Sequence, residues 1–454
     1  MKNDNEILGK EKILKLMFKM GIPTLVAQLI NLLYNMVDRI YIGRIRGAGS
    51  MALTGAGLAL PLILIISAFS AFAGAGGAPL AAIALGKGDK KQAEKILANG
   101  FLILMLFSVL LPIVFWFTKE PLLYLIGASE QTFPYANDYF SVYIFGTIFV
   151  QISIGLNTFI TAQGKPKTAM MSVLIGAVLN IVLDPIFIFV FDMGIKGAAV
   201  ATVISQAVSA IWVMWFLTNK NTYLRIKKEY LKPNLKIILS IAALGVSPFI
   251  MQATESLISI VMNSGLKKYG GDIYVGSLTI LASIVQLISL PVSGFAQGVQ
   301  PIISYNYGAG NPDRVKKTFK LLLAISLAYT ALLSGAAMLF PRLFSSIFTN
   351  ETELINLASK ILPVFVCGMS IFGIQLACQS TFMALGETKS SLFMALLRKV
   401  ILLIPLAIIL PRITNDVMSI YYAEPISDIT SVLVCVLVFT LTIKKVLRTI
   451  QRDK

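Results

Sequence analysis

Twelve long apolar segments restrict this chain to one class of architecture. A helix that crosses a membrane needs about 20 predominantly apolar residues. Segments of this kind recur along the chain at residues 14–40, 52–83, 94–117, 134–162, 168–191, 195–217, 235–265, 274–304, 315–340, 353–385, 390–411 and 417–443. Only 13% of the residues are charged, whereas soluble domains carry about 25%. The sequence therefore predicts an all-α integral membrane protein with twelve transmembrane helices.

The basic residues predict the orientation of these helices. An even number of spans places both termini on one side, and that side carries 27 of the 39 Lys and Arg residues, against 8 on the other. Loops rich in Lys and Arg stay in the cytoplasm. We expect a multi-pass protein of the plasma (inner) membrane with both termini cytoplasmic. The same distribution explains the net charge of +17 without a nucleic-acid partner.

The two halves of the chain repeat each other. LGKGDKKQAEK, from Leu85, corresponds to YGAGNPDRVKK, from Tyr307, and TFITAQGKPK, from Thr158, corresponds to TFMALGETK, from Thr381. Transporters are often built from such repeats, with substrate sites between them near the midplane. We predict two pseudo-symmetric six-helix bundles, residues 1–217 with a cation site and 235–454, joined by a cytoplasmic linker loop at 218–234. Because one chain contains both halves, we expect a monomer.

The fifth span contains a polar pair. Asn180 and Asp184 are four residues apart, so they share one helix face, and Pro185 follows directly. An acid in hydrocarbon costs at least about 2.5–3.5 kcal/mol, so it usually has a function. Asp38 in the first span is either a helix-end acid beside Arg39 or a second carboxylate that approaches Asp184. Two close carboxylates can share a proton or be neutralised by a cation.

The same segments resemble the multidrug and toxic compound extrusion (MATE) transporters. The resemblance covers essentially the whole chain and rests on the repeat, on Pro23 with Asp38, on NIVLDP from Asn180 and on GAAVAT from Gly197. It implies the MATE fold and a cation site for sodium or a proton. That site would be formed by the residues Asp38, Asn180, Asp184, the carbonyl of Ala198, and Thr202. Sodium accepts such oxygen ligands, and the same carboxylates could bind protons instead.

The second half departs from part of the family. Glu255 matches an acid that NorM-type members use in a second cation site, but residues 361–385 contain no partner acid. The chain is therefore expected to be MepA-like or DinF-like rather than NorM-like. Glu255 is assigned to recognition of a cationic substrate, with an internally hydrogen-bonded acid as the alternative. The expected substrate contacts are Gln28, Asn31, Tyr34, Met36, Asn157, Met171, Glu255, Met262 and Gln375.

A further group of charges lies late in the chain. Glu424 and Asp428 in the twelfth span and Arg398 and Lys399 in the eleventh are expected to pair inside the C-terminal bundle, with a proton relay as the alternative. Membrane-buried ionisable residues are commonly paired with one another.

These features favour secondary transport over other functions. The chain has no His, no cysteine pair with metal-ligand spacing and no phosphate-binding G-x-x-x-x-G-K-[ST] motif, so we expect neither an enzyme nor a cofactor. We predict an efflux transporter that exports organic cations and drugs in exchange for Na⁺ or H⁺. A flippase for lipid-linked precursors is the alternative, although such a cavity should be lined by Arg and Lys.

Overall fold

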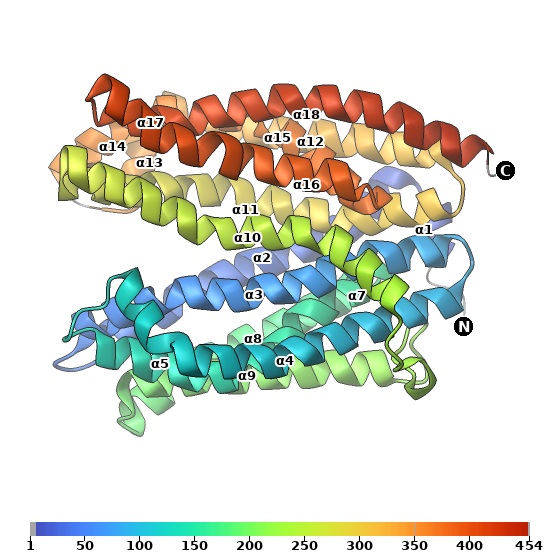
Figure 1. The fold of residues 1–454 in the computed structure, drawn as a ribbon, viewed down its shortest axis with the longest axis horizontal. Coiled ribbons are helices and arrows are strands. Elements are labelled where there is room, and N and C mark those ends of the chain that lie inside the picture. The colour runs from blue at the N-terminus through green and yellow to red at the C-terminus, as the bar shows by residue number, and fades with distance from the viewer. Residues whose placement is uncertain (1–5, 350, 453–454) are drawn as a thin grey trace. The chain divides into compact units, whose positions relative to one another are not determined.

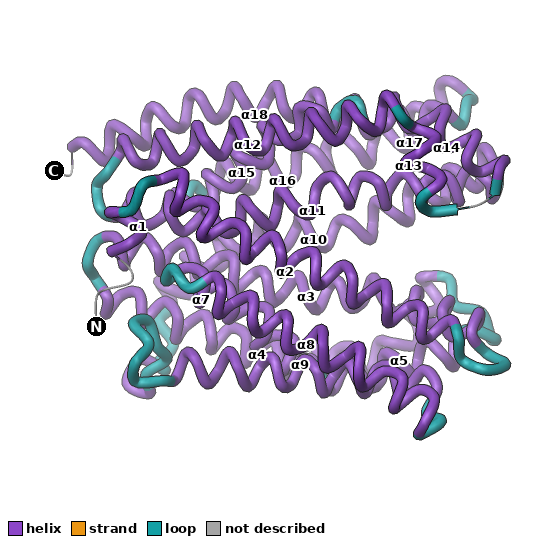
Figure 2. Tube along the Cα trace, turned by 180° about the vertical axis from the view of Figure 1, so that it is seen from behind, coloured by secondary structure: helices purple, strands orange, loops and turns teal. Residues whose placement is uncertain are grey.

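The computed structural model describes residues 6–349 and 351–452, and every regular element in these residues is helical (Figures 1 and 2). This confirms the predicted all-α fold. The α-helices are α1 (Glu6–Lys10), α2 (Ile13–Gly43), α3 (Gly49–Gly86), α4 (Lys90–Ile126), α5 (Phe133–Phe145), α6 (Thr147–Val150), α7 (Asn157–Ala162), α8 (Pro166–Pro185), α9 (Gly194–Thr218), α10 (Leu235–Gly270), α11 (Asp272–Gly308), α12 (Pro312–Leu339), α13 (Pro341–Ser346), α14 (Thr352–Phe365), α15 (Met369–Leu385), α16 (Thr388–Leu396), α17 (Ile404–Thr414) and α18 (Met418–Arg452). The π-helical segments are η1 (Gln151–Leu156), η2 (Ile186–Val190) and η4 (Leu397–Leu403), and η3 (Lys228–Tyr230) is a 3₁₀ turn.

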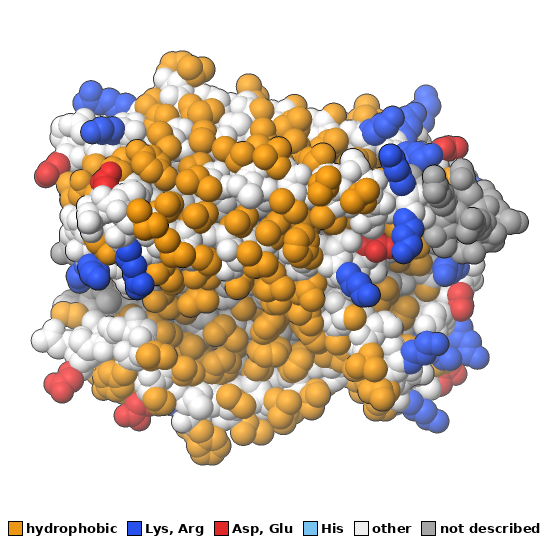
Figure 3. All heavy atoms as spheres, turned by 45° about the horizontal axis from the view of Figure 1, so that its top comes forward, with side chains coloured by type: hydrophobic (Ala, Val, Ile, Leu, Met, Phe, Trp, Pro, Cys, Tyr) orange, Lys and Arg blue, Asp and Glu red, His pale blue; other side chains and the backbone are white. Residues whose placement is uncertain are grey.

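The helices are long and apolar enough to cross a membrane. Among the described residues, 10 helices meet this requirement, or up to 12 if each of two bent pairs forms one span. On the face drawn in Figure 3, hydrophobic side chains cover the middle of the helices, and Lys, Arg, Asp and Glu gather towards their ends. This is the surface that lipid tails and headgroups require. The chain is a multi-pass membrane protein.

Two spans that the sequence presents as continuous are bent. The predicted span 134–162 consists of α5 and a second helical part, Thr147–Ala162, which meet at 60°. The predicted span 353–385 consists of α14 and α15, which meet at 53°. Gly146 and Gly368 lie at the breaks, where glycine lets the chain change direction. Hydropathy could not reveal either bend, because both sides of each break are apolar.

The chain divides into two compact units. Unit 1 comprises Val26–Gln252, and unit 2 comprises Glu6–Leu25 together with the described residues from Ala253 onwards. Helices α2 and α10 therefore each contribute to both units. In each helix the boundary between the units falls shortly after a proline, and these two prolines, Pro23 and Pro248, occupy matching places in the repeat. The predicted bundle limits at 217 and 235 stay a prediction, and those at residues 1 and 454 lie outside the described residues.

The polar connection between α9 and α10 is fixed to unit 1. Lys227 pairs with the buried Glu94 carboxylate of α4 at 2.7 Å, and the backbone N–H of Asn234 donates to the Asn99 side chain at 2.8 Å. The hydrogen bond to Glu94 raises the pKa of Lys227 above its ordinary value. The predicted linker is thus attached to the first unit.

Helices α3 and α10 approach each other in unit 1 through glycines. A Cβ atom on Gly245 would lie 2.0 Å from the carbonyl oxygen of Phe72, and one on Gly76 would lie 2.5 Å from the carbonyl oxygen of Ile241. Any larger residue at either position would push the two backbones apart. Small residues at helix crossings are the usual means of close packing in membranes.

Gly245→Ala is therefore expected to destabilise the protein by about 3 kcal/mol, the upper end of the usual cost of overpacking. Gly57→Ala is the matched control, because a Cβ atom there meets nothing within 4 Å. Both changes improve helix propensity by about 1 kcal/mol, so only packing distinguishes them. Melting temperatures of the purified variants provide the measurement. Equal melting temperatures for both variants would contradict the close helix crossing.

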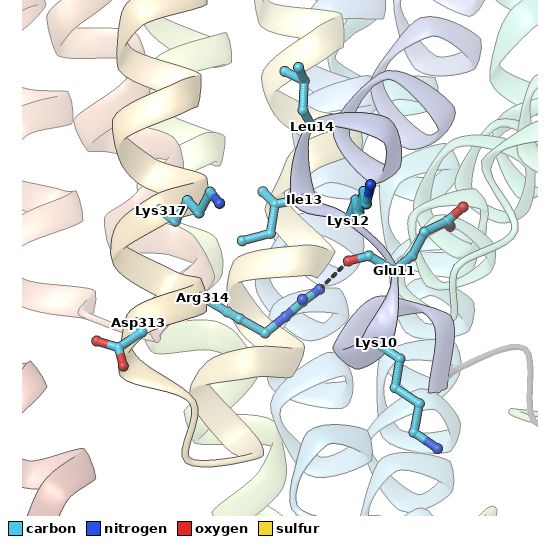
Figure 4. A pocket seen from close by; sticks show the side chains of 8 residues that line it. All are labelled: Lys10, Glu11, Lys12, Ile13, Leu14, Asp313, Arg314 and Lys317. Atoms are coloured by element: carbon cyan, nitrogen blue, oxygen red, sulfur yellow. Dashed lines mark hydrogen bonds between the residues drawn. The ribbon is translucent and has the colours of Figure 1, made fainter.

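Helix α1 is held in place within unit 2 by Arg314 and by Asn306, which donates to the Leu8 carbonyl at 2.9 Å. The Arg314 guanidinium of α12 donates to the backbone carbonyl of Leu8 at 3.1 Å. It also donates to the backbone carbonyl of Glu11 at 2.9 Å (Figure 4). The Leu8 side chain is fully buried. A pocket of about 550 Å³ lies beside this anchor, lined mainly by charged side chains at helix ends. These contacts explain why the chain's first helix packs with its second half.

Candidate functional site

The polar pair of the fifth predicted span lies inside unit 1. Asn180 and Asp184 are on α8 and are 1% and 0% exposed. The Asn180 side-chain N–H donates to Asp184 Oδ1 at 3.1 Å and to Thr202 Oγ1, on α9, at 3.4 Å. The Asn180 side-chain amide therefore links α8 to α9 by hydrogen bonds. The four-residue spacing read from the sequence produces this shared face.

Asp38 reaches the same point from α2. Its carboxyl lies within hydrogen-bonding range of the Asp184 carboxyl. Of the two arrangements that the sequence left open, the structure thus has the one in which Asp38 approaches Asp184. Two carboxyls this close repel each other when both are ionised, so the arrangement favours a proton or a cation between them.

Three oxygen atoms of this site have no hydrogen-bond partner among the described residues. They are Asp38 Oδ1, Asn180 Oδ1 and Asp184 Oδ2, and all three are buried. A buried acceptor without a donor costs free energy. Three such acceptors in one place form a site that a positively charged ligand would complete. The donor set, made of carboxylate, amide and hydroxyl oxygens, fits sodium.

Ala198 contributes at most its backbone. It is fully buried on α9, one helical turn before Thr202. In a regular α-helix its carbonyl accepts the N–H of Thr202, which leaves one lone pair for a further ligand. The predicted carbonyl ligand is thus compatible with the structure.

The described residues contain no group of three or more His, Cys, Asp and Glu side chains that could hold a metal ion. The site has two acids, and its remaining oxygens are neutral. This composition favours a monovalent cation or a proton over a divalent metal.

Helix α8 becomes irregular next to Asp184. Pro185 has no N–H to offer the carbonyl four residues earlier, and the π-helical segment η2 begins directly after it. Helical irregularities of this kind are frequent at functional sites. The proline that the sequence displays beside the acid therefore interrupts the regular hydrogen bonding at the site.

Two tyrosines, Tyr34 and Tyr139, lie beside the acid pair, and a third, Tyr143, lies beside these two; sequence reasoning missed Tyr139 and Tyr143. Tyr139, on α5, lies within hydrogen-bonding range of Thr202 and next to Asp38. Tyr143 and Tyr34 complete the group, and Tyr34 was predicted as a substrate contact. The available signal was the spacing in YANDYFSVY, which repeats tyrosine every four residues along one helix face.

The substrate contacts predicted in unit 1 have mixed surroundings. Met36 is 53% exposed, whereas the Asn157 side chain donates to the carbonyl of Ala169 at 3.1 Å and thereby ties α7 to α8. The remaining predicted contacts of this unit are half-buried and comprise Gln28, Asn31, Tyr34 and Met171. Only Tyr34 joins the acid pair.

The substrate contacts predicted in unit 2 are engaged within that unit. Met262 is 3% exposed and packs in the core, so access to a ligand would require the core to open. Gln375 accepts a hydrogen bond from Ser431 at 2.6 Å. Glu255 is ion-paired with Lys399, which favours the alternative of an internally bonded acid over free recognition of a cation.

The expected pairing of the late charges is confirmed for Arg398, whereas Lys399 pairs with Glu255 instead. Arg398, on η4, donates to Asp428 at 2.6 Å and to Glu424 at 3.0 Å, both on α18. Its guanidinium also lies 4.5 Å from the centre of the Phe372 ring. A cation over an aromatic face gains additional stabilisation.

The chain is similar over most of its length to known membrane transporters. The family model described as MatE matches residues 23–186 and 248–409, one segment in each half of the predicted repeat. The multidrug export protein MepA of Staphylococcus saprophyticus is 26% identical over 430 residues, which cover 94% of each chain. MepA of Staphylococcus aureus is 25% identical over 432 residues, again 94% of each chain. A crystal structure of MATE in the bent conformation superposes with a TM-score of 0.92 at 23% identity, covering 99% of this chain and 100% of the other.

Proposed function

This chain belongs to the MatE family of membrane transporters, and on that basis we propose that it is a secondary active multidrug efflux transporter. It would export organic cations in antiport with Na⁺ or H⁺ by alternating access. Full-length relatives that are multidrug export proteins support this assignment. Membership of a transporter family also means that the chain is not an enzyme.

The acid pair of unit 1 is the observation that carries the proposal. Asp38 and Asp184 lie together in a buried site with three unpartnered oxygens. Binding of Na⁺ or H⁺ there relieves the repulsion between the carboxyls and stabilises the conformation in which α2, α8 and α9 close around the ion. A ligand can shift a conformational equilibrium only through its different affinity for the two states. Exchange follows if the drug favours the state that the ion disfavours.

The orientation and assembly form part of the same proposal. The 27 Lys and Arg residues on one side against 8 on the other support cytoplasmic termini in the plasma membrane. Each chain supplies the complete acid pair from its own helices, which supports a monomer as the working unit.

Dye efflux from proteoliposomes tests the proposal and identifies the ion. Purified protein is reconstituted, ethidium is loaded, and a sodium gradient and a proton gradient are imposed separately. Efflux driven by one gradient and absent without either is the expected result. A transporter that moves ethidium equally well with no gradient would contradict antiport. The flippase alternative predicts no movement of dyes and instead the transfer of a lipid-linked precursor.

Tyr139→Phe is expected to lower the apparent affinity for the coupling ion about threefold to tenfold. The change removes the hydroxyl that interacts with Thr202, a contact for which the usual contribution of one hydrogen bond, about 0.5–1.5 kcal/mol, is expected, and leaves the ring in place. The measurement is the dependence of efflux rate on ion concentration. Tyr135→Phe, one turn earlier on α5, is the control and should leave that dependence unchanged. Equal curves for both variants would exclude Tyr139 from the ion site.

A further inference from the structure

Unit 2 contains a basic pocket between α12 and the segment that joins α1 to α2. The pocket has a volume of about 550 Å³, and all of its lining residues belong to unit 2. Four of the side chains that line it are basic, namely Lys10, Lys12, Arg314 and Lys317 (Figure 4). The proposed efflux mechanism uses none of them.

The two acids in the lining do not neutralise this pocket. The Glu11 carboxylate is already paired with Lys15 at 3.2 Å and Lys19 at 3.3 Å, two lysines that are not part of the lining. Asp313 is exposed, and its carboxylate points away from the Arg314 guanidinium (Figure 4). The pocket therefore keeps a net positive charge, which an anionic ligand would compensate.

Arg314 is held in one orientation by neutral acceptors. Its Nε donates to Asn306 Oδ1 at 2.9 Å, and its Nη2 donates to the backbone carbonyls of Leu8 and Glu11. The other terminal nitrogen, Nη1, has no hydrogen-bond partner among the described residues, and no acid among them pairs with the guanidinium. A guanidinium that is already ordered loses little conformational entropy when it binds a phosphate oxygen.

Two lysines stand on opposite walls of the pocket. Lys12 comes from the connection between α1 and α2, and Lys317 comes from α12. Both are exposed, and neither has an ion pair or hydrogen bond within the part of the chain that the structure describes. Lysine binds phosphate as a flexible point charge, so both side chains can reach an anion that lies beside Arg314.

An apolar stripe on α2 begins at the pocket. Leu14 is part of the lining, and Leu14, Phe18 and Ile22 are 49%, 43% and 49% exposed. They are spaced four residues apart and thus share one helix face. An acyl chain can lie on such a surface, whereas a free phosphate would use only the charge. Positive charge beside an exposed apolar stripe on a membrane helix favours a phospholipid as the ligand.

We propose that this pocket binds the headgroup of an anionic phospholipid. The phosphate lies between Arg314, Lys12 and Lys317, and an acyl chain follows the stripe that begins at Leu14. Because Arg314 also holds α1, a bound lipid would strengthen the attachment of α1 within unit 2. The inference concerns a site that is separate from the acid pair and does not depend on the coupling ion.

Native mass spectrometry of the purified full-length protein, titrated with phosphatidylglycerol or with phosphatidylcholine, tests the site. The unchanged protein should bind phosphatidylglycerol more tightly. The double variant Lys12→Gln with Lys317→Gln should bind it about thirtyfold more weakly, the equivalent of about 1 kcal/mol for each lysine. Both lysines are exposed, so the variant should fold, and its melting temperature without added lipid verifies this.

The matched control removes the same charge from the same helix. Lys316 and Lys320 are exposed on α12 and do not line the pocket. The double variant Lys316→Gln with Lys320→Gln should therefore bind phosphatidylglycerol as the unchanged protein does. Equal weakening in the two double variants would overturn the proposal, because it would mean that general surface charge attracts the lipid.

Two further results would also overturn the proposal. Equal binding of phosphatidylglycerol and phosphatidylcholine would mean that the pocket does not select an anionic headgroup. Displacement of the lipid by glycerol 1-phosphate, which has no acyl chain, at similar concentrations would mean that the site takes a free phosphate. No transport is measured in this experiment, so failure of the proposed efflux function and failure of the lipid site are distinguishable.

Discussion

Asp184→Asn is expected to reduce ethidium efflux from energised cells to the level of cells without the transporter. The substitution keeps the size of the side chain and an oxygen that can accept from Asn180. It removes the negative charge that, with Asp38, attracts the coupling ion. Without ion binding, the drug gradient alone remains as a driving force, and it opposes export.

The control for this variant is Asp192, in the short connection between η2 and α9. Asp192 is exposed and has φ of 53°, a conformation that Asn adopts as readily as Asp. Asp192→Asn should therefore transport like the unchanged protein. Full efflux by Asp184→Asn, at equal amounts of protein in the membrane, would remove the acid pair from the mechanism. Asp38→Asn should repeat the loss, since both acids belong to one site.

Arg398→Met is expected to produce the largest loss of stability, about 3–5 kcal/mol. Methionine fills a similar volume but leaves the buried Glu424 and Asp428 without the positively charged guanidinium that pairs with them. Removing one partner of a buried ion pair costs more than the pair itself contributes, because the remaining charge is uncompensated. The melting temperature of the purified protein should fall accordingly.

Removing the acids as well should restore much of that stability. The triple change Arg398→Met, Glu424→Gln and Asp428→Asn replaces the charges by neutral groups of similar shape, which is often tolerated. Its melting temperature should lie above that of Arg398→Met alone. A melting temperature for Arg398→Met equal to that of the unchanged protein would mean that Arg398 does not stabilise unit 2.

The local parts of the candidate site were predictable from the sequence. Asn180 and Asp184 are four residues apart on one helix, and helical geometry alone places them together. The approach of Asp38 to Asp184 was one of two open arrangements. Tyr139 was missed because its role depends on the packing of α5 against α9, and a tyrosine in an apolar helix has many other uses. The pairing of Glu255 with Lys399 likewise joins residues 144 positions apart.

By itself, the sequence determined that this chain is a helical membrane protein, which segments are apolar enough to cross the bilayer, and that its halves repeat. These properties follow from the cost of placing backbone polar groups and charges in hydrocarbon, which each segment must meet on its own. The tertiary structure decided where the spans bend, that the first parts of α2 and α10 pack with the opposite halves, and which acids face each other. Those outcomes depend on the shapes of side chains from distant segments, and the periodicity of one helix contains no information about its neighbours.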